Sequence, residues 1–386
     1  MDSEDFEVDS PGELIRGFDG RLTFRPNPLP PKLLLDNKLV AAVSRASNTL
    51  GRLDGTARTL PDPRILIRSF IRREAQLSSY IENTYAQYDE VAAAEEQEAS
   101  QPLPQQVRET LNAERTINAG VRAVVEQGQP VSNALIRHLH SMLLAGVEGD
   151  EVRGRFRDRQ VFIGSKLAGV DAARFVPPPP HLLRDLMGDF GDYLSTDDGL
   201  PPLVRLGLMH YQFETIHPFQ DGNGRLGRTL ILLGLCQEGL LTVPVLNASL
   251  YFERNRQDYY DRLLRVSTHG DWHGWLCFFL EGIVVAATET DAKLAELLAL
   301  QRRYHEIVRS AGRSALLLTI IDQLFNRPVI TIPQVQKLLN ITYKSAKNNM
   351  EKLQAADLVE PVPNTYPAQF VAREILTALN PIPTRR

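Results

Sequence analysis

The chain contains 386 residues, enough for two or three domains, and its 43% hydrophobic and 23% charged residues are typical of an ordinary globular protein. The formal net charge of −4 excludes binding to nucleic acid or to an anionic membrane through bulk positive charge. The two cysteines, Cys236 and Cys277, lie in apolar runs, which excludes a disulfide framework and favours a role for both as small core residues.

The first thirty residues are acidic and then punctuated by proline, a composition that predicts a flexible arm over residues 1–30. The acidic start, MDSEDFEVDS, differs from the basic start of a secretory signal. Apolar stretches such as TLILLGLC are too short to span a bilayer. We therefore expect a cytoplasmic protein.

Apolar residues recur at helical spacing through most of the chain up to residue 310. Residues 31–100 are expected to form an N-terminal helical segment, and residues 101–310 a larger helical core. Within the core a short hairpin is predicted at 152–164, where an arginine-rich stretch ends in the β-prone VFI. The core helices are predicted at 105–127, 132–146, 181–195, 251–266 and 272–309, and on both sides of the segment 217–228.

The pattern changes near residue 310, where we place a domain boundary. Residues 311–386 contain three helical segments, SALLLTIIDQLF, TIPQVQKLLN and TYKSAKNNMEKLQ, followed by the β-prone and proline-rich YPAQFVA. A short turn between the second and third helices, followed by a hairpin, predicts a winged helix-turn-helix. The predicted fold class is therefore all-α, with a small hairpin in the core and a winged helix at the C-terminal end.

The segment HPFQDGNGRLGR, residues 217–228, concentrates chemically active side chains between two predicted helices. Its GNGRLG matches the G-x-G-x-x-G template of dinucleotide-binding loops, but that template requires a preceding strand, and the residues before it have helical spacing. A calcium loop is excluded because the alternating Asp/Asn ligands and the distal Glu are missing. The chain has no GK pair, so a Walker A loop is excluded as well.

What remains is a helix–loop–helix whose second helix begins near the glycines. The free N–H groups at such a helix start bind phosphate readily, and Gly222 and Gly224 allow the backbone to approach an anion closely. Arg225 and Arg228, three residues apart, can neutralise phosphate oxygens together. The pattern thus indicates a triphosphate cradle, with the carboxylate of Asp221 and the imidazole of His217 suited to Mg²⁺ and to a general base, respectively.

This segment resembles, at every position, the signature of Fic domains, H-x-F-x-[DE]-G-N-G-R-x-x-R. Fic proteins mostly transfer AMP from ATP to a Ser, Thr or Tyr hydroxyl of a protein, so the resemblance implies a protein adenylyltransferase, a nucleotidyltransferase. It implies that His217 deprotonates the target hydroxyl, that Asp221 holds Mg²⁺ and that Phe219 plugs into the core. The residues implied to contact ATP along this segment are Gly222, Asn223, Gly224, Arg225, Leu226, Gly227 and Arg228.

Two further stretches resemble parts of the family. The predicted hairpin, GRFRDRQVFIG, looks like the Fic flap, whose edge pairs with the backbone of the target; a purely structural hairpin is the alternative. The residues of that edge would be Val161, Phe162, Ile163 and Gly164. SLYFERNRQDYYDRL resembles a later helix of the family, in which Asn255 and Tyr259, with its neighbour Tyr260, lie near the nucleoside, although the tyrosines could equally belong to the core.

SSYIEN, residues 78–83, resembles the inhibitory motif of Fic proteins, [ST]-x-x-x-E-[GN], with Ser78, Glu82 and Asn83 at its defined positions. It lies upstream of the core on a predicted helix, as in N-terminally inhibited Fic proteins. The resemblance implies that the Glu82 carboxylate pairs with Arg228 and occupies the place of the γ-phosphate. A solvated surface glutamate is the alternative, and a role of Glu82 in aligning a water for removal of AMP stays open.

The residues from 313 to the end contain nine Lys or Arg and five Asp or Glu, an excess of positive charge over the rest of the chain. The predicted third helix carries Lys344, Lys347, Asn348, Asn349 and Lys352, residue types that contact phosphates and base edges in helix-turn-helix proteins. Winged helices also serve in protein docking and dimerisation. The expected partners are therefore ATP, a hydroxyl-bearing protein target or the chain itself, with DNA and a second copy as further candidates, and no membrane.

Two other functions remain open. A Fic relative of the same fold could transfer UMP, phosphocholine or phosphate. Alternatively, the chain could be a nucleotide-sensing regulator whose winged helix binds DNA, although such a sensor needs no base at His217.

Overall fold

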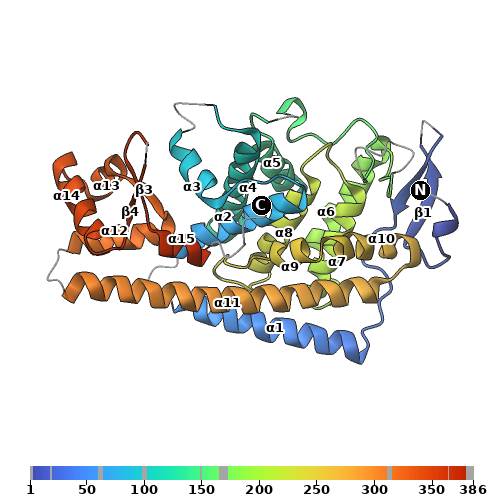
Figure 1. Ribbon diagram of the computed structural model, residues 1–386. Helices are drawn as coiled ribbons and strands as arrows, with labels where there is room; N and C mark the ends of the chain where they lie inside the picture. The colour runs from blue at the N-terminus through green and yellow to red at the C-terminus, as the bar shows by residue number, and fades with distance from the viewer. Residues whose placement is uncertain are drawn as a thin grey trace.

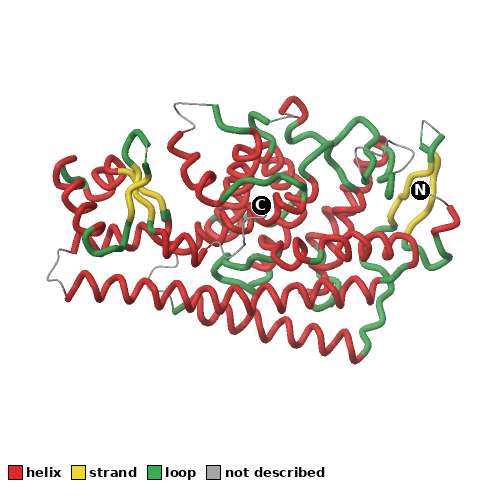
Figure 2. Tube along the Cα trace, in the orientation of Figure 1, coloured by secondary structure: helices red, strands yellow, loops and turns green. Residues whose placement is uncertain are grey.

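The computed structural model describes residues 3–17, 20–59, 64–97, 102–147, 150–164, 173–310, 315–363 and 365–379. Helices make up most of this part of the chain, and the strands are confined to its N-terminal and C-terminal ends, shown in yellow in Figure 2. The predicted all-α class is therefore confirmed. Within these residues, no helix combines the length and the hydrophobicity that a membrane span requires.

Two long helices lie side by side along one edge of the molecule, α11 (Trp272–Ser310) and α1 (Asn37–Arg58) (Figure 1). Ion pairs of Arg45 with Glu281, at 3.3 Å, and of Arg52 with Asp291, at 3.7 Å, join them in parallel register. The apolar face of α1 is buried, and Asp36 caps its first turn by accepting from the N–H of Leu39 at 2.8 Å. This pair forms the base on which the other helices pack.

The remaining core helices lie on one side of this pair (Figure 1), and α7, α9 and α10 contact α11. The core helices on this side are α2 (Arg64–Ile81), α3 (Tyr88–Gln97), α4 (Gln105–Val121), α5 (Asn133–Leu143), α6 (Leu183–Ser195), α7 (Pro202–Ile216), α8 (Asn223–Gln237), α9 (Ser249–Arg254) and α10 (Arg256–His269). One turn of π-helix (Arg122–Glu126) extends α4, and 3-10 turns occur at Ser3–Asp5, Asp150–Val152 and Pro180–Leu182. The helices predicted between residues 105 and 309 are confirmed, except that 251–266 is divided at Asn255 into α9 and α10.

The N-terminal segment differs from the predicted flexible arm. It forms an antiparallel hairpin of β1 (Gly12–Arg16) and β2 (Leu22–Pro26). Phe24 is fully buried against the ring of Phe175, and its N–H donates to the carbonyl of Val176 at 2.9 Å. The hairpin is therefore held by residues about 150 positions away, which local composition does not reveal.

The hairpin predicted at 152–164 is reduced to a single antiparallel bridge between Ile163 and Phe175. The N–H groups of both residues donate to the carbonyl of the other, at 2.9 and 3.1 Å. The residues that connect the two sides, 165–172, lie outside the described part of the chain.

The C-terminal part begins with α12 and ends with α15. Its elements are α12 (Ala315–Asn326), β3 (Val329–Thr331), α13 (Ile332–Leu339), α14 (Tyr343–Gln354), β4 (Glu360–Val362), β5 (Gln369–Val371) and α15 (Arg373–Leu379). The strands form one antiparallel sheet in the order β3-β5-β4, and Thr331 with Gln334 makes a capping box at the start of α13. The predicted order of three helices and a hairpin is present, together with the unpredicted strand β3. The winged-helix assignment and the boundary near residue 310 stay predictions.

Candidate active site

The segment 217–228 joins α7 to α8 in a tight loop. His217 ends α7 in a left-handed conformation, with φ 50°, and its N–H donates to the carbonyl of Phe213 at 3.0 Å. Gly222, with φ 78°, precedes the first residue of α8, a conformation that favours glycine. The predicted helix–loop–helix is thus confirmed, and the absence of a strand before it fits the exclusion of a dinucleotide fold.

Phe219 and Asn223 fix the shape of the loop. Phe219 is fully buried, as predicted, and its ring stacks on that of His140 at 3.7 Å between centroids. The Asn223 amide accepts from the N–H of Phe219 at 2.9 Å and donates to its carbonyl at 2.8 Å. Because both ends of this amide are used and the residue is 1% exposed, only the backbone of Asn223 is left to face an anion.

His217 presents a neutral imidazole with one nitrogen available. Nδ1 lies 3.2 Å from the carbonyl of Glu214, to which it must donate, so Nε2 carries the lone pair. Among the described residues, Nε2 has no hydrogen-bond partner. Burial, with the nearby charge of Arg157, lowers the pKa of His217 to about 4, so the ring is neutral and can accept a proton at neutral pH.

The start of α8 provides unpaired N–H groups. The first helical bond runs from the N–H of Leu226 to the carbonyl of Gly222, at 3.0 Å, and no side chain of the described residues caps this end. The preceding N–H groups, from residue 223 to residue 225, therefore have no partner inside the helix. Together with the helix dipole they are suited to an anion, so the phosphate cradle expected from the sequence stays a prediction that this geometry permits.

Both arginines of the motif are buried at this helix start, and each already contacts a carboxylate. Arg225 donates to Glu109 of α4 at 2.9 Å and lies 3.7 Å from Asp221. Arg228 is 1% exposed and donates to Glu82 at 2.8 Å. In these contacts, carboxylates of the chain take the places where phosphate oxygens would be expected.

Glu82 follows directly after α2 and reaches the first turn of α8. A Cβ atom at position 224 would collide with its Oε1, so the glycine there admits the carboxylate. Ser78, one turn earlier, accepts from Nε of Arg228 and, through its carbonyl, from a terminal nitrogen, both at 2.9 Å. Asn83 ends the segment with φ 63° and accepts from Arg256 at 2.7 Å. The predicted pair of Glu82 with Arg228 is therefore present.

Two further acids near Arg228 were not identified from the sequence. Burial raises the pKa of Glu214 to about 8, and its Oε1 has no partner among the described residues. Burial likewise raises the pKa of Glu74 to about 7, and Glu74 accepts from the hydroxyl of Ser249 at 2.5 Å. Glu74 lies four residues before Ser78 and eight before Glu82, so helical spacing along α2 could have indicated it. No comparable signal marks Glu214.

Asp221 offers one open carboxylate beside the helix start. Its side chain is 62% exposed, Oδ1 accepts from the N–H of Gly222 at 2.6 Å, and its carbonyl accepts from His140 at 3.0 Å. No group of three or more His, Cys, Asp or Glu that could hold a metal occurs in the residues described. One hard oxygen is nevertheless what Mg²⁺ requires from the protein when it arrives with phosphates.

The nucleoside contacts predicted for Asn255 and Tyr259 stay predictions. Tyr259 is 1% exposed and donates its hydroxyl to His210 at 2.8 Å, so in this structure it packs in the core. Its neighbour Tyr260 is only partly buried and donates to the carbonyl of Ile81, next to Glu82, at 3.4 Å. Asn255 is also partly exposed, between α9 and α10, and donates to Tyr251 at 2.9 Å. Tyr260 is therefore the tyrosine that borders the site.

Leu226 and Gly227 face the core as well. Leu226 is fully buried, and the carbonyl of Gly227 accepts from His210 at 3.2 Å. Their contact with ATP stays a prediction, and in this structure the helix start and the two arginines are the parts of the segment with groups suited to an anion.

The predicted flap edge lies in a partly exposed stretch. Val161, Phe162 and Ile163 are partly buried, and Gly164 is exposed. Ile163 is engaged by the bridge to Phe175, while a guanidinium from the N-terminal hairpin, that of Arg21, lies 5.9 Å from the ring centre of Phe162.

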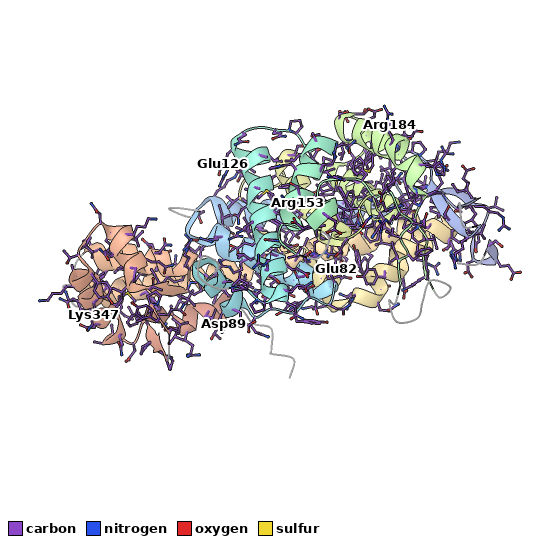
Figure 3. All side chains as sticks on the ribbon, turned by 90° about the horizontal axis from the view of Figure 1, so that it is seen from above. Glu82, Asp89, Glu126, Arg153, Arg184 and Lys347 are labelled. Atoms are coloured by element: carbon purple, nitrogen blue, oxygen red, sulfur yellow. The ribbon has the colours of Figure 1, made fainter. Side chains whose placement is uncertain are left out.

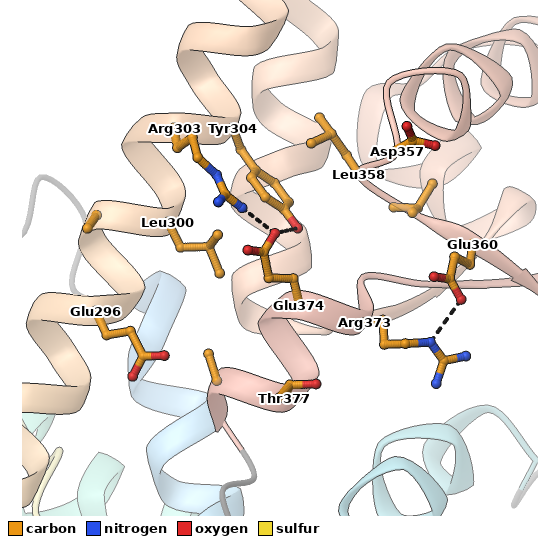
Figure 4. Close-up of a pocket in the computed structure, with 13 residues that line it drawn as sticks. Glu296, Leu300, Arg303, Tyr304, Asp357, Leu358, Glu360, Arg373, Glu374 and Thr377 are labelled. Carbon is orange, nitrogen blue, oxygen red and sulfur yellow. Dashed lines mark hydrogen bonds and ion pairs between the residues drawn. The ribbon is translucent and has the colours of Figure 1, made fainter.

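A cavity of about 640 Å³ lies elsewhere, where α11 meets α15 and the C-terminal sheet (Figure 4). Several polar side chains of its lining contact one another: Arg303 and Tyr304 both contact Glu374, and Arg373 contacts Glu360 at 2.8 Å. None of the motif residues lines this cavity, so it is separate from the candidate active site.

Comparisons with known proteins agree with this geometry. A family model described as Fic/DOC family N-terminal matches residues 40–122, which include Glu82. A second model, described as Fic/DOC family, matches residues 130–235, which include the whole segment 217–228. A probable protein adenylyltransferase of Aquifex aeolicus is 28% identical over 198 residues, which cover 50% of this chain and 58% of the relative. The protein adenylyltransferase Fic of Nematostella vectensis is 30% identical over 172 residues, covering 44% and 36%. The chain thus spans less than two thirds of the length of either relative.

Solved structures share the fold. A Fic family protein from Desulfovibrio desulfuricans G20 superposes with a TM-score of 0.58 at 22% identity, covering 89% of this chain and 98% of that one. A fragment of Fic-1 from C. elegans has a TM-score of 0.53 at 18% identity, with 68% and 74% covered.

Proposed function

The chain belongs to the Fic/DOC family, and on that premise we propose that it transfers AMP from ATP to a hydroxyl group of a protein and releases pyrophosphate. One observation carries the proposal. The neutral His217, whose Nε2 is open, lies on the same rigid loop as an uncapped helix start with two buried arginines. A base and an anion site at this spacing suit attack by a hydroxyl on a bound phosphate.

In the proposed reaction, Nε2 of His217 takes the proton of the target hydroxyl as its oxygen attacks the α-phosphorus. The bond from the α-phosphorus to the bridging oxygen of pyrophosphate breaks, and its electron pair leaves with pyrophosphate. The N–H groups at the start of α8, with Arg225 and Arg228, stabilise the charge on the leaving phosphates. Mg²⁺ held by Asp221 would neutralise further phosphate charge.

We propose that Glu82 inhibits this reaction. Its carboxylate is bonded to Arg228 and lies against the first turn of α8, so a triphosphate must compete with it for the same cation and the same helix end. A bound ATP displaced from this position would present the α-phosphorus poorly to His217. The same carboxylate could align a water molecule that removes AMP from the modified protein by hydrolysis, a second activity that the sequence leaves open.

The target is proposed to dock along residues 161–164, with the chain itself as one candidate substrate. The C-terminal part is proposed as a winged helix, and an exposed face of α14 with Lys344, Lys347 and Lys352 supports contact with DNA phosphates as a second function. Lys347 lies in the C-terminal part, well away from Glu82 (Figure 3). A nucleotide-sensing regulator would use both features without transfer.

Incubation of the purified chain with Mg²⁺ and ATP labelled at the α-phosphate tests the proposal. We expect protein-bound label that increases in Glu82→Gly and disappears in Glu82→Gly/His217→Ala. Label from ATP carrying the isotope at the γ-phosphate would instead indicate phosphate transfer. If neither the chain nor an added protein extract becomes labelled from ATP, UTP, CTP or GTP, transfer of a nucleotide is excluded and the regulator becomes the better account.

A further inference from the structure

Arg157 is a buried guanidinium that the proposed reaction does not yet use. The residue is 3% exposed and lies between the end of α7 and the base of the predicted flap. It makes no ion pair with a carboxylate among the described residues. All of its side-chain hydrogen bonds in the structure go to backbone carbonyl groups, so its position is fixed by the main chain around it.

Two of these carbonyls belong to the end of α7. Nε donates to the carbonyl of His217 at 2.8 Å, and a terminal nitrogen donates to that of Ile216 at 3.3 Å. The backbone N–H of Arg157 donates to Pro218 at 2.9 Å. Carbonyls at a helix C-terminus lack partners and carry the negative end of the helix dipole, so a guanidinium there is favourable.

Two further carbonyls belong to the two sides of the flap. One terminal nitrogen donates to the carbonyl of Arg159 at 3.3 Å, and the other to that of Pro178 at 2.6 Å. Residue 159 precedes the predicted docking edge, and residue 178 follows the bridge partner Phe175. The guanidinium therefore ties both sides of the flap to the residue proposed as the base.

We propose that Arg157 is a positioning residue that holds His217 and the base of the flap in one fixed arrangement, so that a docked hydroxyl meets Nε2. The inference rests on the proposed function. Only arginine suits this role, because its planar fork of five N–H donors reaches several carbonyls at once, whereas lysine offers three donors on one atom. His217 is held in a left-handed conformation, which a residue other than glycine adopts at a cost and which these bonds stabilise.

The charge of Arg157 has a second effect, on the protonation of His217. The groups that face the imidazole are Arg157 from the flap base, Glu82 from the end of α2, and Asp221 from its own loop. Arg157 disfavours the imidazolium, whereas the two carboxylates favour it. Removal of the guanidinium should therefore raise the pKa of His217, and a distant structural defect should not.

The experiment compares Arg157→Met and Arg157→Lys with Arg159→Met, all in the Glu82→Gly background. Arg159 is a matched control because it lies two residues away and its side chain is 83% exposed. Three quantities are measured: the Kd for ATP by calorimetry, kcat for transfer, and the pKa of the His217 imidazole by NMR titration. Circular dichroism and thermal unfolding establish that each variant is folded.

For Arg157→Met we expect kcat to fall about 100-fold, as a small misplacement of reacting groups does, with an ATP Kd within about 2-fold of the parent. The pKa of His217 should rise. Arg157→Lys should leave that pKa near the parent value and restore only part of kcat, and Arg159→Met should change nothing. Should Arg157→Met fail to fold, Arg157→Lys alone tests the inference. Lysine keeps the positive charge but cannot hold all of the carbonyls, so kcat should fall while the pKa of His217 stays near the parent value.

A kcat and a His217 pKa unchanged in Arg157→Met would overturn the inference, as would a loss of ATP binding that equals the loss of transfer. If the Glu82→Gly parent shows no transfer with any nucleotide, the proposed function fails. The NMR titration still decides whether Arg157 sets the state of His217, so the two failures are distinguishable.

Discussion

Replacement of Glu82 is the sharpest perturbation that the structure suggests. Its carboxylate accepts one hydrogen bond from Arg228 at 2.8 Å, and the variant Glu82→Gly removes this contact. Arg228 keeps its two bonds to Ser78, both at 2.9 Å, so the guanidinium should stay in place. The change therefore opens the anion site without removing the residue that would bind phosphate.

The size of the effect follows from the type of bond. A hydrogen bond between charged groups contributes about 1.5–3 kcal/mol. The Glu82 side chain is 33% exposed, so solvent screening favours a value near the lower half of that range, about 2 kcal/mol. Since about 1.4 kcal/mol corresponds to a factor of ten, removal of the competitor should raise kcat/KM for ATP roughly 30-fold.

The assay measures initial incorporation of label from α-labelled ATP at ATP concentrations well below KM, so that the rate reports kcat/KM. Glu82→Gln, which keeps the size of the side chain and loses its charge, should increase the rate less than Glu82→Gly. Glu126→Gln is the control, because Glu126 is exposed and lies apart from Glu82 (Figure 3). Equal rates and equal ATP affinities in the parent and Glu82→Gly would refute competition between this carboxylate and the triphosphate.

Three further predictions concern the site. His217→Ala in the Glu82→Gly background should reduce transfer at least about 100-fold, while the Kd for ATP measured by calorimetry stays within about 2-fold of the parent value. With His217 intact, the rate of transfer should not depend on the protonation of this group above about pH 5, because its pKa is lowered to about 4, and the rate should fall at lower pH as the imidazole becomes protonated. Asp221→Asn should raise the Mg²⁺ concentration needed for half-maximal transfer, measured by metal titration, and an unchanged requirement would exclude Asp221 as a ligand. In the folded chain the pKa of Glu214 is about 8, above its value in the unfolded chain, so stability is lost as the pH rises from the unfolded to the folded pKa. Glu214→Gln removes this effect and should therefore raise the melting temperature relative to the parent more at pH 8 than at pH 5. Equal shifts of the melting temperature at both pH values would contradict the raised pKa.

Much of the fold could be predicted from the local pattern of apolar residues in the sequence. Helical periodicity identified the core helices within a few residues, because their burial follows from apolar residues three and four apart. It failed for the hairpin at 12–26, whose stability depends on contacts with Phe175 and Val176 that no local window contains. The division of 251–266 at Asn255 also escaped prediction, since the flanking residues continue the helical spacing.

In the candidate site, too, some residues can be predicted from the local sequence and others depend on contacts between distant parts of the chain. The motif predicted that His217, a helix start and both arginines lie together, and the structure brings them together, while their roles stay predictions. The sequence does not say which of the neighbouring residues Tyr259 and Tyr260 borders the site, because adjacent residues on a helix point about 100° apart and only the packing decides between them. Arg157 carries no local signal, since its hydrogen-bond partners are carbonyl groups that every residue possesses.

The face of α2 shows where such reading could be extended. Glu74, Ser78 and Glu82 follow one another at intervals of four, so Glu74 and Ser78 lie in one row along α2 and Glu82 continues this row just after the helix ends. The row meets α8 and its surroundings: Glu82 and Ser78 bind Arg228, and Glu74 accepts from Ser249 one turn deeper. Periodicity predicts that these residues share a partner surface, but only the packing of α2 determines that the surface contains Arg228. The position of the Glu82 carboxylate therefore depends on the docking of the whole helix, and substitutions along this row should affect it as well as those at Glu82.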